Sequence, residues 1–151
     1  MNVVYQNISN EDPALRCLCV ETVAFIASKS DALKELYKNP DDLKKSTEKI
    51  GEMIKSNRED EKAKSKILDA VAMIFDHSIS SNDVEISMIC EKLFHHLSSE
   101  PVNFLMEIAR QPFFGLRYGA LKVLSNVSNF TWVEQDMALC AGMFHRTKNF
   151  K

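Results

Sequence analysis

The stretch RQPFFGLRYGALKVL, from Arg110 to Leu124, carries the pattern that decides the fold. Proline is favoured in the first turn of a helix and excluded from its interior, so Pro112 marks the break between two helices. Beyond it, apolar side chains recur every three or four positions, the spacing of one buried helix face: Phe113, Leu116, Ala120, Leu124 and Val127. The sequence therefore predicts a packed helix that begins at Pro112 and ends near Asn129.

Earlier parts of the chain repeat this helix. The segment ALRCLCVETV (Ala14 to Val23) resembles GLRYGALKVL (Gly115 to Leu124), and VETVAFIA (Val20 to Ala27) resembles LDAVAMIF (Leu68 to Phe75). The copies lie roughly 50 residues apart, close to the period of HEAT and armadillo units. In this register two positions recur, one held by Arg16, Lys64 and Arg117 and the other by Val23, Val71 and Leu124.

Helical spacing also fills the rest of the chain, whereas the strict alternation of a β-strand is nearly absent. Glycine and proline are scarce, at four each, which favours helix over sheet. We therefore predict an all-α fold, a HEAT/armadillo-like helical-repeat solenoid (an α–α superhelix) of about three repeat units. It is expected to form a single domain over residues 1–151, with poorly ordered ends at residues 1–11 and 146–151. An ordinary helical bundle is the alternative architecture.

Local signals place the starts of several helices. Asp12 can cap the free N–H groups of a first helix that has Pro13 in its first turn. The charged segment from Arg58 to Lys66 is expected to be a solvated loop that leads into a helix. Ser81 or Asn82 is expected to cap the following one.

The composition argues against several classes of partner. Nineteen basic residues nearly balance 21 acidic ones, and no block of lysine and arginine alternates with aromatic residues, so we expect no nucleic acid. No apolar run approaches about 18 residues, so no membrane partner is expected either. The N-terminal residues lack the pattern of a signal peptide. The four cysteines form no C-x-x-C pair, which favours reduced thiols in a protein of the cytoplasm or nucleus.

No constellation of residues predicts an enzyme. His95 and His96 are adjacent and project about 100° apart on a helix, so they cannot hold one metal ion together. Glu91 lies one turn before His95, a spacing that more often gives a surface contact than a site. We predict no catalytic residue, cofactor, metal or small-molecule substrate. A small helical hydrolase is an alternative that would require a closed polar pocket near His95 or Asp76.

The candidate site residues are ones that would contact a protein partner. Arg16, Lys64 and Arg117 would form a basic ladder facing acidic residues of that partner, unless each caps or forms a salt bridge within its own repeat. Phe114 and Tyr118 lie one turn apart and off the buried stripe, so we expect them to be exposed contacts. Trp132 has the residue type favoured in interface hot spots, with packing at a helix start as its alternative role.

Longer segments resemble a known family. QPFFGLRYGALKVLSNVSNFTW (Gln111 to Trp132) resembles a segment of the proteasome non-ATPase regulatory subunit 5 family, in which Q-P-F is followed by A-L-K-V and then by a tryptophan. EDPALRCLCVETVAFIASKSDALKEL is similar to a D-P…V-D-T-V-G-I-L-G stretch of that family, and KSKILDAVAMIF to its K-I-R-C-L-D-A-I-S-S-L helix. The resemblance is collinear from about Asp12 to Trp132 and fades after Trp132.

The resemblance implies a HEAT/armadillo solenoid that acts as an assembly chaperone of the proteasome regulatory particle. Such a chaperone holds the C-terminal domain of one base AAA ATPase subunit, regulatory subunit 7, while the ATPase ring is put together. Members of the family are much longer, so the chain is expected to be a fragment or a diverged short form. The alternative is a general armadillo-type adaptor for extended peptides, against which the absence of an asparagine ladder weighs.

Overall fold

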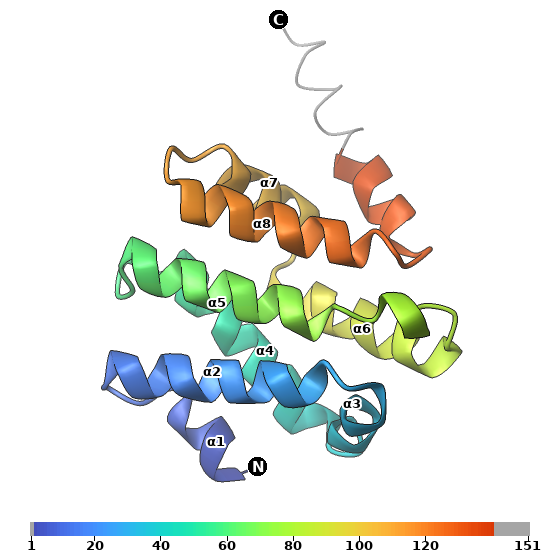
Figure 1. The fold of residues 1–151 in the computed structure, drawn as a ribbon, viewed down its shortest axis with the longest axis horizontal. Coiled ribbons are helices and arrows are strands. Elements are labelled where there is room, and N and C mark those ends of the chain that lie inside the picture. The colour runs from blue at the N-terminus through green and yellow to red at the C-terminus, as the bar shows by residue number, and fades with distance from the viewer. Residues whose placement is uncertain (1, 141–151) are drawn as a thin grey trace, which may run out of the picture.

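A computed structural model describes residues 2–140 of the chain, and every regular element among them is a helix (Figure 1). The all-α prediction is therefore confirmed over these residues. The last described segment, residues 133–140, is also helical. The preceding elements are α1 (Asn2–Asn7), α2 (Pro13–Ala27), α3 (Ser30–Leu36), α4 (Pro40–Lys55), α5 (Glu61–Ile74), the short 3-10 helix η1 (Ser78–Ser80), α6 (Val84–Leu97), α7 (Pro101–Ala109) and α8 (Phe114–Val127).

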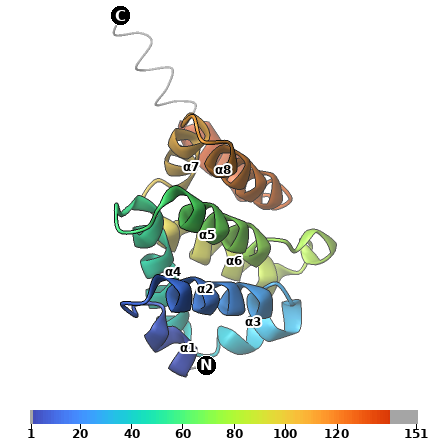
Figure 2. The same ribbon diagram turned by 60° about the vertical axis from the view of Figure 1, so that its left-hand side comes forward.

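The long helices are arranged in two layers. Helix α5 packs against α2 on one side and against α8 on the other, so that the three lie side by side in one layer (Figure 1). Helices α4 and α6 pack together behind them, and α7 packs against α8 (Figure 2). Helices α2, α5 and α8 contain the three segments in which the sequence shows a repeat.

Side-chain caps define where several helices begin. Asp12 accepts a hydrogen bond from the Ala14 N–H at 3.0 Å, and Pro13 occupies the first turn of α2, as predicted. Asp60 accepts from the Ala63 N–H at 2.7 Å and so starts α5 inside the charged segment. The cap of α6 is Asp83 and neither Ser81 nor Asn82, because the Asp83 carboxylate reaches two backbone N–H groups of the first turn.

The repeat register differs by one residue from the predicted one. Five buried positions of α2 recur in α5 and in α8, but in α8 they fall one position earlier than the sequence comparison indicated. Val23 and Val71 therefore correspond to Val123, and Arg16 corresponds to the buried Leu116. Arg117 is exposed, because a shift of one residue turns a side chain by about 100° around the helix. The buried positions are Cys19, Val20, Val23, Ala24 and Ala27 in α2, Ile67, Leu68, Val71, Ala72 and Phe75 at α5, and Gly119, Ala120, Val123, Leu124 and Val127 in α8.

Glycines allow the closest approaches between helices. A Cβ atom on Gly119 of α8 would lie 2.8 Å from the Leu68 Cβ of α5, and one on Gly51 of α4 would collide with the Leu97 carbonyl of α6. Gly115 lies against Ser65 in the same way. These residues have ordinary helical conformations, so what they provide is space rather than a special backbone angle.

The N-terminal end differs from the expectation for residues 1–11. Residues 2–7 form α1, which packs against α2, and Ile8 is buried in the core. The apolar side chains of this segment explain the difference, since Val4 and Tyr5 also pack against the core. The other expected end, residues 146–151, lies outside the described residues.

Candidate binding surface

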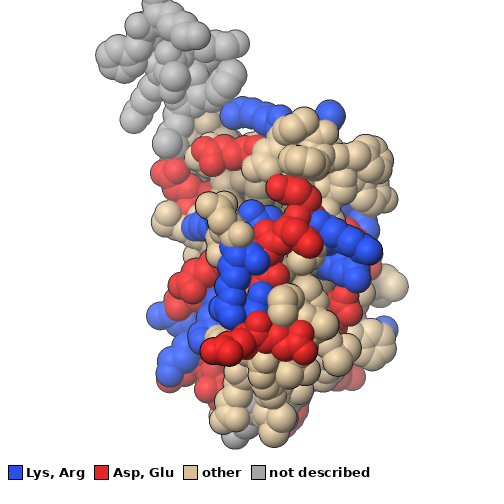
Figure 3. All heavy atoms as spheres, turned by 90° about the vertical axis from the view of Figure 1, so that its left-hand side faces the viewer, with Lys and Arg blue, Asp and Glu red and all other residues tan. Residues whose placement is uncertain are grey.

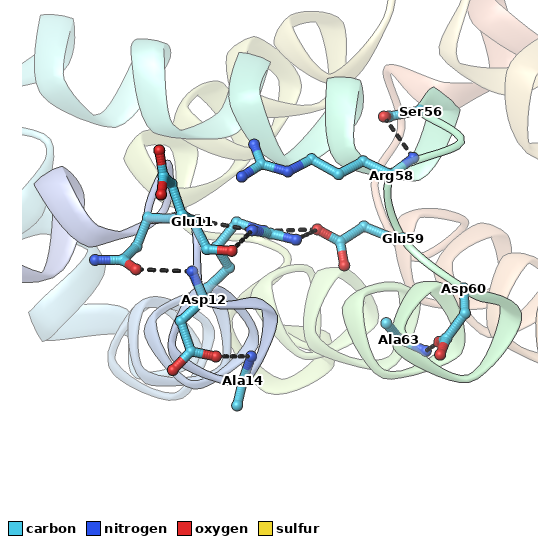
Figure 4. A network of polar contacts seen from close by, with 10 residues as sticks. Glu11, Asp12, Ala14, Ser56, Arg58, Glu59, Asp60 and Ala63 are labelled. Atoms are coloured by element: carbon cyan, nitrogen blue, oxygen red, sulfur yellow. Dashed lines mark hydrogen bonds and ion pairs between the residues drawn. The ribbon is translucent and has the colours of Figure 1, made fainter.

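Arg16 is an internal residue and cannot belong to a surface ladder. Its side chain is 2% exposed, and its Nη2 atom lies 2.6 Å from Oε1 of Glu59, which is equally buried. Its Nη1 atom donates to the backbone carbonyl oxygens of Asn10 and Glu11 at 2.7 and 2.9 Å (Figure 4). The prediction of a partner-facing ladder is therefore wrong at Arg16. The alternative of a salt bridge within its own repeat is not met either, because Glu59 lies just before α5, in the next copy of the repeat.

The other two members of the predicted ladder do not face the same environment. Lys64 is half-buried in the first turns of α5, whereas Arg117 is exposed on α8. No carboxylate oxygen of the described residues lies within 4.0 Å of either cationic group. Neither residue therefore forms an ion pair within the described part of the chain, and the structure does not join them to Arg16 in one row.

Phe114 and Tyr118 form an exposed aromatic pair at the start of α8. Their side chains are 78% and 54% exposed, and their rings stack with centroids 5.9 Å apart and planes inclined by 13°. The Nζ atom of Lys122 lies 5.0 Å from the Tyr118 ring centroid and forms a cation–π contact with it. Tyr118 therefore contacts a residue one turn before it, Phe114, and a residue one turn after it, Lys122. The predicted position of this pair, off the buried stripe, agrees with the exposure of both side chains.

Phe113 departs from the buried stripe to which the sequence assigned it. It is the N-cap residue of α8 and has extended backbone angles, so its side chain does not follow the helical direction of Leu116. It is half exposed and lies next to Phe114 in the chain. The N-terminal end of α8 thus carries three aromatic side chains in contact with solvent, those of Phe113, Phe114 and Tyr118.

Trp132 is partly buried and packs against the core. Its ring stacks on Phe130 with centroids 5.6 Å apart and lies 5.5 Å from the Phe94 ring of α6. The indole Nε1 atom is buried and has no acceptor among the described residues. Trp132 therefore fixes the turn after α8 onto α6, which agrees with the alternative role of packing, while its partly exposed side leaves a contact with a partner as a prediction.

The outward side of α5 adds basic residues that the sequence analysis did not single out. Lys62, Lys66 and Asp69 are spaced by one helical turn each, and the Asp69 carboxylate lies 3.4 Å from the Lys122 Nζ of α8. Lysine and arginine side chains lie among aspartate and glutamate side chains over the middle of this end of the molecule, with a group of uncharged side chains beside them (Figure 3). In the sequence, the only sign of Lys62 and Lys66 was the charged run from Arg58 to Lys66. That run alone does not show which side chains lie on the same face of the helix.

A groove separates the first turns of α2 and α5 on the same side of the molecule. Its walls combine apolar and charged side chains, and the exposed Leu18 forms part of its α2 wall. Lys62 and Lys66 form part of the α5 wall. Helix α5 therefore presents its lysines between this mixed apolar and charged groove on one side and the aromatic pair of α8 on the other.

A second pocket lies near His95, where the alternative of a hydrolase would require one. His95 Nε2 lies 2.9 Å from the Asp136 Oδ2, and Cys140 also lines the pocket. No hydrogen bond joins the Cys140 thiol to the imidazole in the described part of the chain. A catalytic nucleophile needs that contact with its base, and the pocket is open and mostly apolar, so it does not support hydrolysis.

The described residues offer no reactive thiol at Cys90, no metal-binding cluster and no membrane-spanning helix. Burial raises the pKa of the Cys90 thiol to about 12, which keeps it protonated and unreactive. Over residues 2–140 no cluster of three or more potential metal ligands occurs. Within the same residues no helix combines the length and the apolar character needed to cross a bilayer.

Comparisons with known proteins give one consistent result. The family model described as proteasome non-ATPase 26S subunit matches residues 1–145. The bovine 26S proteasome non-ATPase regulatory subunit 5 is 26% identical over 137 residues, and its human counterpart is 25% identical over 134 residues. These alignments cover 91% and 89% of this chain but only 27% and 26% of the two relatives, so the chain spans about a quarter of their length. No solved structure gives a significant match.

Proposed function

Because the chain belongs to the proteasome non-ATPase 26S subunit family, we propose that it is a protein-binding chaperone in assembly of the proteasome regulatory particle base. In this role it holds the C-terminal domain of one base AAA ATPase subunit, regulatory subunit 7, without covalent chemistry. The observation that carries the proposal is the family match over residues 1–145, together with relatives named as regulatory subunits of the 26S proteasome.

The fold supports the proposal through its repeated layer. Helices α2, α5 and α8 bury corresponding positions and stack in the same order as in the sequence, which is the arrangement expected of three HEAT/armadillo-like units. We propose that they belong to about three repeat units of an α–α superhelix. A surface built in this way is long and presents side chains from several helices to one partner.

The exposed side chains support binding rather than catalysis. A contiguous group of exposed apolar side chains at the start of α8 is typical of an interaction site, because such groups are otherwise covered. The four cysteines are free thiols, which fits a protein of the reducing cytoplasm or nucleus. An adaptor that binds extended peptides remains the second candidate, favoured by the groove between α2 and α5.

A pull-down tests the proposal. The full chain is immobilised and offered the separate C-terminal domains of the base AAA ATPases in equal amounts. The proposal predicts selective retention of one domain, that of regulatory subunit 7. Equal retention of all the domains, or retention of none of them, would contradict the proposed function.

A further inference from the structure

The outward side of α5 and α8 combines aromatic and basic side chains, and we infer that it binds a protein segment in which apolar side chains alternate with carboxylates. The surface consists of Phe114, Arg117, Tyr118 and Leu121 on α8 and Lys62 and Lys66 on α5, and we refer to it as the α5–α8 surface. The inference rests on the proposed function, because it specifies the chemistry of the partner segment that this protein holds.

The α8 side supplies the apolar contacts. Phe114, Tyr118 and Leu121 are spaced by four and three residues, so they lie on one face of the helix, and each is more than half exposed. The stacked rings of Phe114 and Tyr118 are already held in one orientation, so a partner side chain can cover them with little loss of conformational freedom. Covering this apolar surface removes it from water and so favours the complex.

The cationic groups supply charge of one sign. Among the described residues, no carboxylate oxygen lies within 4.0 Å of the side-chain nitrogens of Lys62, Lys66 or Arg117. The acidic residue on the same face of α5, Asp69, is already paired with Lys122. The carboxylates of Glu21 and Asp60 line the groove with Lys62 and Lys66 but form no ion pair with them. The three cations are therefore free to pair with carboxylates of a partner, and lysines of a partner would be repelled by them.

Helix packing brings the two halves together. Gly115 of α8 lies directly against the Ser65 side chain of α5, and one turn further along Asp69 reaches Lys122. Lys66 lies on the same face of α5 as Asp69, and Tyr118 lies on the same face of α8 as Lys122. The basic and aromatic side chains therefore form one continuous surface across two neighbouring helices.

The neighbouring groove explains how a segment could extend further. Lys62 and Lys66 also line the groove between α2 and α5, which has the exposed Leu18 on its opposite wall. A segment that crosses the layer would meet apolar side chains on α8, then the lysines of α5, and then Leu18 on α2, with the carboxylates of Glu21 and Asp60 also lining the groove. This order matches a partner segment in which carboxylates are flanked by apolar side chains.

Fluorescence anisotropy of the full chain tests the inference. The probe is a short fluorescein-labelled peptide in which phenylalanine and leucine alternate with aspartate. Two matched peptides carry lysine in place of aspartate, or serine in place of the apolar residues. We expect the acidic, apolar peptide to bind at least tenfold more tightly than either matched peptide, a difference of about 1.4 kcal/mol.

Variants locate the binding. Phe114→Ala and Lys62→Glu change exposed side chains and should each weaken binding about tenfold, with an unchanged melting temperature. Phe25→Ala removes another exposed ring, near the C-terminal end of α2, and should leave the affinity unchanged. Equal binding of the lysine peptide, no detectable binding of the acidic, apolar peptide, or wild-type affinity in both α5–α8 variants would overturn the inference.

The outcome is separable from that of the proposed function. If the acidic peptide binds at the α5–α8 surface while no ATPase domain is retained, the proposed function fails and the inference stands. If one ATPase domain is retained with equal affinity by wild type, Phe114→Ala and Lys62→Glu, the proposed function stands and the inference fails.

Discussion

Arg16 and Glu59 form a fully buried ion pair, with Nη2 and Oε1 2.6 Å apart and 2% of each side chain exposed. The guanidinium also binds two carbonyl oxygens of the segment before α2, so it joins that segment, α2 and the start of α5. Removing one member of such a pair leaves the other charged and buried.

Glu59→Ala should therefore lower the free energy of unfolding by about 3–5 kcal/mol. Urea unfolding followed by circular dichroism measures the effect. The control is Glu35→Ala, which removes the carboxylate from an exposed pair with Lys38 and should leave the unfolding midpoint nearly unchanged. Equal, small effects of the two changes would show that the buried pair does not stabilise the junction between α2 and α5.

Gly119→Ala should destabilise the protein, although alanine normally favours a helix over glycine. The added methyl group would lie 2.8 Å from the Leu68 Cβ, an atom close to the backbone that cannot turn away. We expect a loss of about 1–3 kcal/mol, as for other overpacked interfaces. Gly115→Ala is the matched control, because its methyl group would meet the rotatable Ser65 hydroxyl and should cost less. A stabilising effect of Gly119→Ala would contradict the close packing of α5 on α8.

His77 should make the protein less stable in mild acid. Its Nε2 atom lies 3.0 Å from the Ala27 carbonyl oxygen and its Nδ1 atom 3.3 Å from the Ser30 hydroxyl, so it links the end of α5 to the turn after α2. Burial lowers the pKa of His77 below its ordinary value of 6.5, against the opposing effect of the hydrogen bond to Ala27. The unfolded chain therefore binds a proton before the folded one does.

The free energy of unfolding should stay level above pH 7 and fall as the pH drops through 6.5 toward the lowered pKa of folded His77. Unfolding curves at pH 7.5, 6.5 and 5.5 measure this, and His77→Gln should reduce the slope. Burial also lowers the pKa of His96, so some slope of the same sign should remain. Stability that is level or rises over this range in the wild type would contradict the buried, neutral state of His77.

Tyr118→Ala should weaken partner binding with little loss of stability, because the side chain is 54% exposed. Calorimetric titration with the retained ATPase domain should show a loss of about tenfold in affinity. The buried Phe130 provides the contrast, since Phe130→Ala should cost about 3–5 kcal/mol of folding stability. A melting temperature that falls in Tyr118→Ala by several degrees would place this residue in the core.

The sequence predicted the features that depend on local spacing. Asp12 and Pro13 start α2 as expected because a cap is a contact between near neighbours in the chain. The buried stripe of α8 follows from the helical period, with the exception of Phe113, where the helix has not yet begun. Phe114 and Tyr118 were predicted as exposed for the same reason: their spacing places them off that stripe.

Features that depend on distant contacts were not predictable in this way. Arg16 and Glu59 are 43 positions apart, and nothing near either residue indicates that they meet in the core. Trp132 packs against Phe94 from a different helix, a contact that its residue type alone does not indicate. The register of α8 was off by one because a few matching residues cannot fix an alignment, whereas five buried positions can.

Preference for a single base ATPase is the property that tests the proposed chaperone role most directly. Isothermal titration calorimetry of the full chain against each isolated C-terminal domain measures it under one set of conditions. We predict that the domain of regulatory subunit 7 binds at least tenfold more tightly than every other domain, a difference of about 1.4 kcal/mol. Equal affinities for all the domains, or no measurable heat with any of them, would contradict it.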